Sequence, residues 1–274
     1  MEGVSALNVI LGIRRMHRDK GHPMVAMPMV GAVVKGLMRR IQEEYGESHP
    51  DLLLPKRKEP FTIEILDRLS SIASGSVRVA GRQTLVWESE PGRALWALLC
   101  TMCSTGLRKS EVSRTSPDEK RPIAMRSSVR YRIGGVVLSA PTADQLRSMG
   151  RGDCVILIPP PSKSDQFGTV WGASPIYLAW GRERRNACRA LVAMELGAMV
   201  CGGDRLSTPL FSPGGGKAFT GYALDSTLRA MLLSFLPPAR VALYSWHSAR
   251  IYLACALKAA GASPGLPCCP PVPL

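Results

Sequence analysis

The stretch PGRALWALLCTMCSTGLRKSE, residues 91–111, predicts a long buried helix followed by a turn and the start of another helix. Proline suits a first helical position, since the amide it lacks would be unsatisfied there anyway. The apolar residues that follow form a helical face: Leu95, Leu98, Leu99 and Met102. Glycine favours the left-handed conformation that often ends a helix, so Gly106 marks the expected end. Arg108 then follows a core helix almost directly.

Toward the N-terminus, Ile63 to Ile72 predicts an amphipathic helix with Glu64 in its first turn, where the helix dipole favours an acid. The preceding stretch from Ser48 to Pro60, SHPDLLLPKRKEP, contains three prolines and a basic cluster. It is typical of an interdomain linker. Residues 1–50 then form a separate small module, which we expect to contain two helices.

These two helices carry clustered basic side chains. The candidates for contact with a DNA backbone are Arg14, Arg15, Arg18, Lys35 and Arg39. The same residues could equally be the solvated face of a helical bundle. The sequence leaves both interpretations open.

Toward the C-terminus the hydrophobic period changes. Val129 to Leu138 indicates strands, and Val155–Ile158 and Ile176–Leu178 flank the polar turn PPPSKSDQFGTVWG. This pattern predicts a β-hairpin with Lys163 near its tip. Two charged segments, Thr115–Arg126 and Ala140–Asp153, are interpreted as inserted loops.

Helical periodicity returns in the last part of the chain. The expected helices are Ala187–Met199, Tyr222–Phe235 and Ser248–Ala260. Helices, then a small sheet, then helices again indicate a mostly helical α+β domain with a small antiparallel sheet.

The charge balance favours a polyanionic partner. Lys and Arg number 35 against 21 Asp and Glu, a net charge of +14 in 274 residues. Such a surface attracts nucleic acid through its phosphates, although basic solubility alone is the plainer interpretation. No apolar run is long enough for a membrane span, and the first residues lack a secretory signal. We therefore expect double-stranded DNA rather than a membrane as partner.

The eight cysteines do not form a disulfide framework. Cys100 and Cys103 have the spacing of metal ligands, but no second pair follows at a zinc-site interval. Their apolar context predicts a buried helix face and no metal. Cys154, Cys188, Cys201 and Cys255 are likewise expected to be reduced thiols in the core. Residues 214–217, GGGK, lack the flanking residues of a phosphate loop and predict a turn.

Three segments stand out together. They are Thr105–Glu111 (TGLRKSE), the hairpin lysine Lys163, and Tyr244–Arg250 (YSWHSAR) with Ala254 and Gly261 beyond it. Individually, each is explained by capping, solvation or helix packing. In this order they resemble the tyrosine recombinases, the phage-integrase family, over residues 61–262. The resemblance implies an integrase-like catalytic domain preceded by a partial helical core-binding, SAM-like module in residues 1–50.

The resemblance also implies roles around a DNA phosphate. Arg108 and Arg250 would clamp the non-bridging oxygens, because a guanidinium binds two of them at once. His247 would transfer a proton and Lys163 would protonate the leaving oxygen; Lys109 and Lys120 suit that role less, since neither occupies a hairpin. Glu111 would orient neighbouring groups, with a surface ion pair as the plainer interpretation. No metal or other cofactor is implied.

The family's nucleophilic tyrosine has no counterpart after Arg250, where only Tyr252 occurs and we expect it to pack in the core. The proline-rich segment 263–274 predicts no helix and indicates a frameshift, a splice product or a decayed mobile element. We therefore expect DNA binding related to integration and recombination without strand cleavage, inside the cell and in a nucleus if the source has one. The resemblance allows a homo-oligomer on DNA. A non-catalytic basic DNA-binding protein and a type IB topoisomerase relative are the alternatives.

Overall fold

The structure is a computed structural model that describes residues 58–78, 84–116, 119, 122–161, 174–201 and 204–262, with the helical positions 36, 40 and 43. The chain divides into two compact units, residues 1–57 and 58–274, and this division lies inside the stretch expected to be a linker. The proline-rich segment 263–274 lies outside the described residues.

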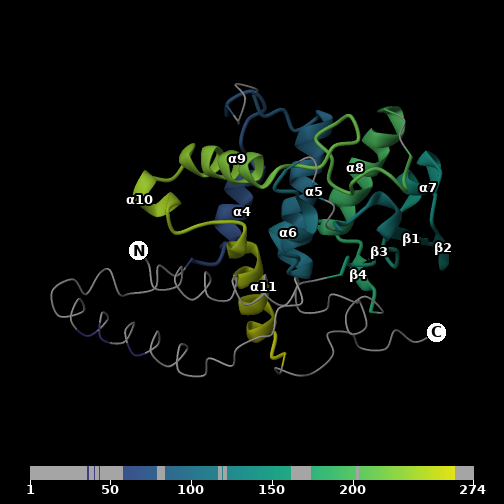
Figure 1. Cartoon of the computed structure of the whole chain (residues 1–274). Helices are drawn as coiled ribbons and strands as arrows, with labels where there is room; N and C mark the ends of the chain where they lie inside the picture. Colours follow the sequence, from purple (N-terminus) through teal and green to yellow (C-terminus); the bar gives the residue numbers. More distant parts are fainter. Residues whose placement is uncertain are drawn as a thin grey trace, which may run out of the picture. The chain divides into compact units, whose positions relative to one another are not determined.

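Helix α5, Glu90–Thr105, is the centre of the second unit and packs against α8, Ala187–Cys201, and α11, His247–Ala259 (Figure 1). The Ser89 hydroxyl caps it by accepting the amide of Gly92 at 3.2 Å, and Gly106 ends it at φ 66°. The predicted core helix is confirmed at both ends. Gly197 of α8 lies against the Arg93 side chain, which shows how closely α5 and α8 approach.

The remaining helices surround this centre. They are α4 (Ile63–Ser70), α6 (Lys109–Val112), the 3₁₀ turn η2 (Arg126–Ser128), α9 (Gly221–Leu233) and α10 (Pro238–Val241). The predictions of helices near residues 63–72, 187–199, 222–235 and 248–260 are confirmed with small shifts at the ends. Thr62 caps α4 by accepting the amide of Ile65 at 3.3 Å, and Glu64 lies in its first turn as predicted.

A four-stranded antiparallel sheet lies beside the helices, in the order β2–β1–β3–β4. Its strands are β1 (Val129–Ile133), β2 (Val136–Leu138), β3 (Cys154–Leu157) and β4 (Ile176–Ala179). Cys154 pairs with Ala179 and Leu157 with Ile176, so the predicted pairing of these two strands is confirmed. The prediction of helices combined with a small antiparallel sheet is confirmed as well.

One of the two segments expected to be inserted loops contains a helix, so that prediction was wrong for Ala140–Asp153; the described residues of Thr115–Arg126 form no helix or strand before η2 begins at Arg126. Ala143–Ser148 forms helix α7, capped by Thr142, whose hydroxyl accepts the Gln145 amide at 3.2 Å while Gln145 accepts the Thr142 amide at 2.7 Å. Leu146 anchors this helix in the core. In the other segment, Ala124 and Arg126 are buried.

The first residues of the second unit are hydrogen-bonded to the turn before α11 and to the start of α11. The Glu59 amide donates to the Leu243 carbonyl at 2.9 Å, and the Phe61 amide donates to the Ser248 carbonyl at 3.3 Å. The Phe61 ring stacks on Tyr244 with 5.9 Å between centroids. These contacts hold the turn that leads into α11.

The cysteines whose side chains the structure describes follow the prediction with one exception. Cys100, Cys103, Cys154 and Cys188 are buried free thiols, whereas Cys255 is exposed on α11. The expectation of a core position for Cys255 was wrong, because α11 turns this part of its surface outward. The burial of Cys201 lies outside the described side chains. Among the described residues, no helix is both long and apolar enough to cross a bilayer.

Candidate functional site

Arg108 lies between the end of α5 and the start of α6, with its side chain 36% exposed. Its guanidinium donates to Glu111 Oε1 at 2.9 Å, and its backbone amide donates to Glu111 Oε2 at 2.7 Å. One carboxylate therefore fixes both the backbone and the side chain of Arg108. The guanidinium keeps an accessible edge and a defined direction.

Glu111 is buried, with its side chain only 9% exposed, so it is not a surface ion pair. Its carbonyl accepts the amide of Ala124 at 2.9 Å, which ties α6 to the next segment of the chain. A buried carboxylate needs a charged or hydrogen-bonding partner. Arg108 provides both kinds of contact.

His247 is the first residue of α11 and Arg250 follows about one turn later, as the sequence predicts for residues three positions apart on a helix. His247 is exposed and Arg250 is half-buried. The turn before them is tight: the Ser245 hydroxyl accepts the His247 amide at 3.2 Å, and the Ser248 hydroxyl accepts the Ser245 amide at 3.1 Å. Ser248 and Ala249 are fully buried and anchor the turn.

A close contact joins these two parts of the site. A Cβ placed on Gly106 would lie 3.3 Å from Cδ2 of Leu253, on α11. Because Gly106 precedes Arg108 by two residues and Leu253 follows Arg250 by three, the two motif segments lie side by side. Within the described part of the chain, however, no hydrogen bond or ion pair links Arg108 to His247 or Arg250.

The other predicted site residues are not part of this geometry. Lys163 lies outside the described residues, and so do the five basic residues of the N-terminal helices: Arg14, Arg15, Arg18, Lys35 and Arg39. Tyr252 is partly buried and packs against the core, as expected. The turn at residues 214–217 is closed by the Lys217 amide, which donates to the Gly214 carbonyl at 3.3 Å.

The cysteine pair of α5 has the properties of core thiols. Burial raises the pKa of Cys103 to about 12 and raises the pKa of Cys100 well above its ordinary value. Metal ligation needs the thiolate, which burial disfavours. In the described ranges, no three His, Cys, Asp or Glu side chains are grouped as metal ligands would be.

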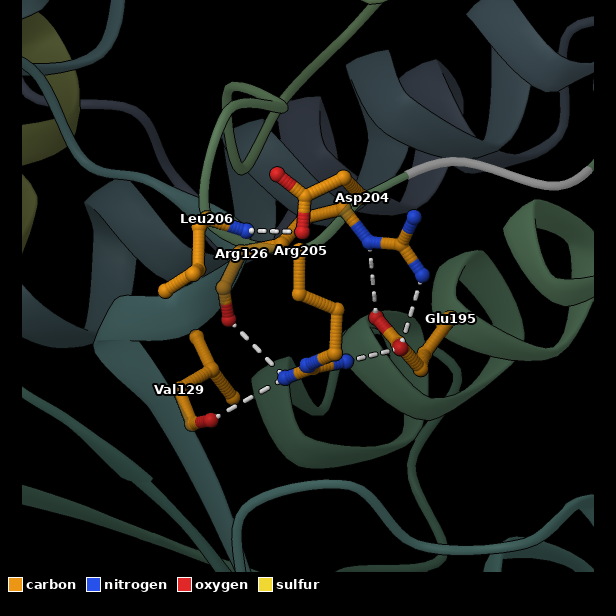
Figure 2. A network of polar contacts seen from close by, with 6 residues as sticks. All are labelled: Arg126, Val129, Glu195, Asp204, Arg205 and Leu206. Carbon is orange, nitrogen blue, oxygen red and sulfur yellow. Dashed lines mark hydrogen bonds and ion pairs between the residues drawn. The ribbon is translucent and has the colours of Figure 1, made fainter.

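A buried ionic network at the sheet is a feature that the sequence analysis missed (Figure 2). The Arg126 guanidinium donates to Glu195 Oε1 at 2.8 Å and to Oε2 at 3.3 Å, and Arg205 also pairs with Oε1. Arg205 further donates to the carbonyls of Arg126 at 2.9 Å and Val129 at 3.1 Å. The network ties the start of β1 to α8 and to the segment after α8.

The carboxylate and one of the two arginines of this network are buried, and Arg205 is partly buried. Glu195 is 1% exposed and Arg126 is 5% exposed. The Arg205 guanidinium lies over the Tyr131 ring at 6.0 Å from its centroid, and burial raises the pKa of Tyr131 above its ordinary value. With its donors and acceptors occupied inside the fold, the network supports structure rather than ligand binding.

Comparison with known proteins assigns no family: no family model matches the chain, and no curated protein matches it significantly.

Proposed function

We propose that this chain binds double-stranded DNA through a phosphate clamp formed by Arg108, His247 and Arg250, as in the tyrosine recombinases that its motifs resemble. The observation that carries the proposal is the contact of Gly106 with Leu253, which brings the TGLRKSE turn next to the helix that begins with HSAR. Two arginines from distant parts of the sequence then lie on neighbouring elements.

The chemistry of the three side chains fits a phosphodiester. A guanidinium stays ionised and can donate two parallel hydrogen bonds to phosphate oxygens. Glu111 orients Arg108 before any ligand binds, which lowers the entropy cost of binding. His247 is exposed at the N-terminus of α11, where the helix dipole favours an anion. Lys163, whose placement lies outside the described residues, remains the proposed proton donor.

We also infer that these 274 residues bind DNA without cutting it. Tyr252 is the one tyrosine that follows Arg250 in the sequence, and its side chain packs against the core. A nucleophile must reach the phosphorus from the open side of the clamp. Incubation with supercoiled plasmid is therefore expected to leave the plasmid closed, and a nicked product would contradict this inference.

The clamp is tested by fluorescence anisotropy with a labelled DNA duplex. The double variant R108Q/R250Q is expected to bind at least tenfold more weakly than the unaltered chain. A matched control, R130Q/R147Q, removes the same charge from exposed arginines of β1 and α7 and is expected to change affinity little. The single variant Arg250→Gln is tested as well, because none of the described residues forms an ion pair with Arg250 and the substitution is expected to leave the fold intact. Weaker binding by this variant then reflects a lost contact with DNA.

The net charge of +14 favours a second candidate, a basic protein that coats DNA without a defined phosphate site. In that case both double variants weaken binding equally, and His247→Ala has no effect. Equal losses would therefore reject the clamp and support the coating function.

A further inference from the structure

A cavity of about 370 Å³ opens beside the proposed clamp, between α9, α10 and the turn before α11. Three cationic side chains line it, Lys58, Lys109 and Arg229, together with one carboxylate, Asp225. The apolar residues at its base are Leu228, Leu232 and Val241.

The cations in this cavity are not all neutralised. Lys109 pairs with Asp225 at 2.6 Å. Lys58 donates to the carbonyl of Ala242 at 2.7 Å, a contact that orients the ammonium group and leaves its positive charge uncompensated. Arg229 forms no ion pair with any described residue. Two positive charges therefore face the cavity without a counterion.

The apolar base of the cavity strengthens the electrostatic attraction between these cations and an anion. Leu228, Leu232 and Val241 are buried and keep the dielectric constant low beneath the cations. An anion that enters the cavity loses some hydration but gains two charge-assisted contacts. A neutral or cationic ligand would gain neither contact.

The walls of the cavity continue directly into both segments of the clamp. Lys109 follows Arg108 in the sequence, and Ser245, another lining residue, accepts the amide of His247 through its hydroxyl. Because the Cα atoms of consecutive residues are about 3.8 Å apart, Lys109 in the cavity wall lies close to Arg108 of the clamp. A DNA strand carries one phosphate per about 3.4 Å of helix axis, so a strand held at the clamp brings its neighbouring phosphates within reach of the cavity.

We propose that Lys58 and Arg229 bind a second backbone phosphate of the same DNA strand, next to the phosphate held by the clamp. This inference rests on the proposed function, since it needs DNA at the clamp. Two anchored phosphates set the direction in which the strand crosses the domain. One anchored phosphate would let the strand rotate about the clamp.

The test is the salt dependence of duplex binding by the full chain. Each neutralised phosphate contributes about 0.9 to the slope of log affinity against log salt. The variant K58Q/R229Q is expected to lower that slope by about one, and R108Q/R250Q is expected to do the same. If the two phosphates are different, the quadruple variant lowers the slope by about two. The control R130Q/R147Q is expected to leave the slope unchanged.

The outcomes separate the two proposals. An unchanged slope in K58Q/R229Q, alongside a lowered slope in R108Q/R250Q, overturns the second phosphate and keeps the clamp. A quadruple variant no different from either double variant assigns all four cations to one phosphate and also overturns it. A chain that fails to bind DNA rejects both proposals. A last outcome assigns the cavity to a free anion and overturns the second DNA phosphate. In that outcome the unaltered chain does not bind DNA, and inorganic phosphate raises its melting temperature but not that of K58Q/R229Q.

Discussion

Glu195 carries a negative charge in a place that water hardly reaches, and two arginines compensate it. Neither arginine could be recognised as its partner in the sequence. Arg126 lies 69 positions away and precedes a strand, where an exposed cation is the ordinary expectation. The groups meet because the packing of α8 against β3 and β4 places Glu195 next to η2, the turn that contains Arg126. Local patterns contain no signal for such a pair, since helix spacing rules reach three or four residues.

Glu195→Gln is expected to lower the free energy of unfolding by about 3 kcal/mol or more, because it leaves the buried Arg126 guanidinium and the partly buried Arg205 guanidinium without a counterion. Urea denaturation followed by circular dichroism measures the change. Asp144→Asn is the control: it removes an ion pair with Arg147 that is exposed on both sides, and no measurable change is expected. Similar losses in the two variants would show that the buried network does not stabilise the fold.

The element that matters most for the candidate site is the turn between α5 and α6. Gly106 adopts φ 66°, a conformation that costs a residue with a Cβ, and the added Cβ would also press on Leu253. Gly106→Ala should therefore destabilise the fold by about 1 kcal/mol or more and should also weaken DNA binding, because it pushes α11 away from Arg108.

Gly134→Ala is the matched control for this change. Gly134 has a similar φ of 56°, but an added Cβ would meet nothing within 4 Å. It carries the same backbone strain without the contact to α11. Thermal unfolding of both variants measures the loss of stability that the backbone strain causes. Fluorescence anisotropy with labelled DNA then measures whether Gly106→Ala weakens DNA binding more than Gly134→Ala does. Equal loss of DNA binding in both variants would show that the contact with Leu253 does not position the clamp.

The elements themselves were largely predictable. Caps and periodicity marked α4, α5, α8, α9 and α11, and alternation marked the strands. Helix α7 was missed although Thr142 and Gln145 have the spacing of a capping box, because the charged residues around them suggested a loop. The motif segments Thr105–Glu111 and Tyr244–Arg250 were found from the sequence. Their juxtaposition was not, since it depends on the packing of α11 against α5.

At the scale of the whole molecule, the buried thiols make stability depend on alkaline pH. In the unfolded chain a cysteine ionises near pH 9, whereas burial raises the pKa of Cys103 and Cys188 to about 12 in the folded state. Between pH 8 and 10 the unfolded state loses these protons and the folded state keeps them. The free energy of unfolding therefore falls as the pH rises, by about 1 kcal/mol for each thiol at pH 10.

Urea denaturation at pH 8, 9 and 10 measures this loss. The variant C103A/C188A is expected to be less stable at pH 8, because it removes buried volume, but its stability should change less with pH. Other ionising groups, Tyr131 among them, remain in both proteins and cancel in the comparison. An identical pH dependence in the two proteins would contradict the raised pKa values.

The fastening of Glu59 and Phe61 to Leu243 and Ser248 has a consequence for how the protein is made. A ribosome releases residues 58–61 early and the turn before α11 late, so the first segment has no partner during most of synthesis. Helices α4 and α5 can form on the nascent chain. The positions that hold His247 and Arg250 cannot form until the end of the domain has left the ribosome. The proposed phosphate clamp therefore forms only after α11 has been synthesised, and a chain interrupted before α11 lacks two of its three side chains.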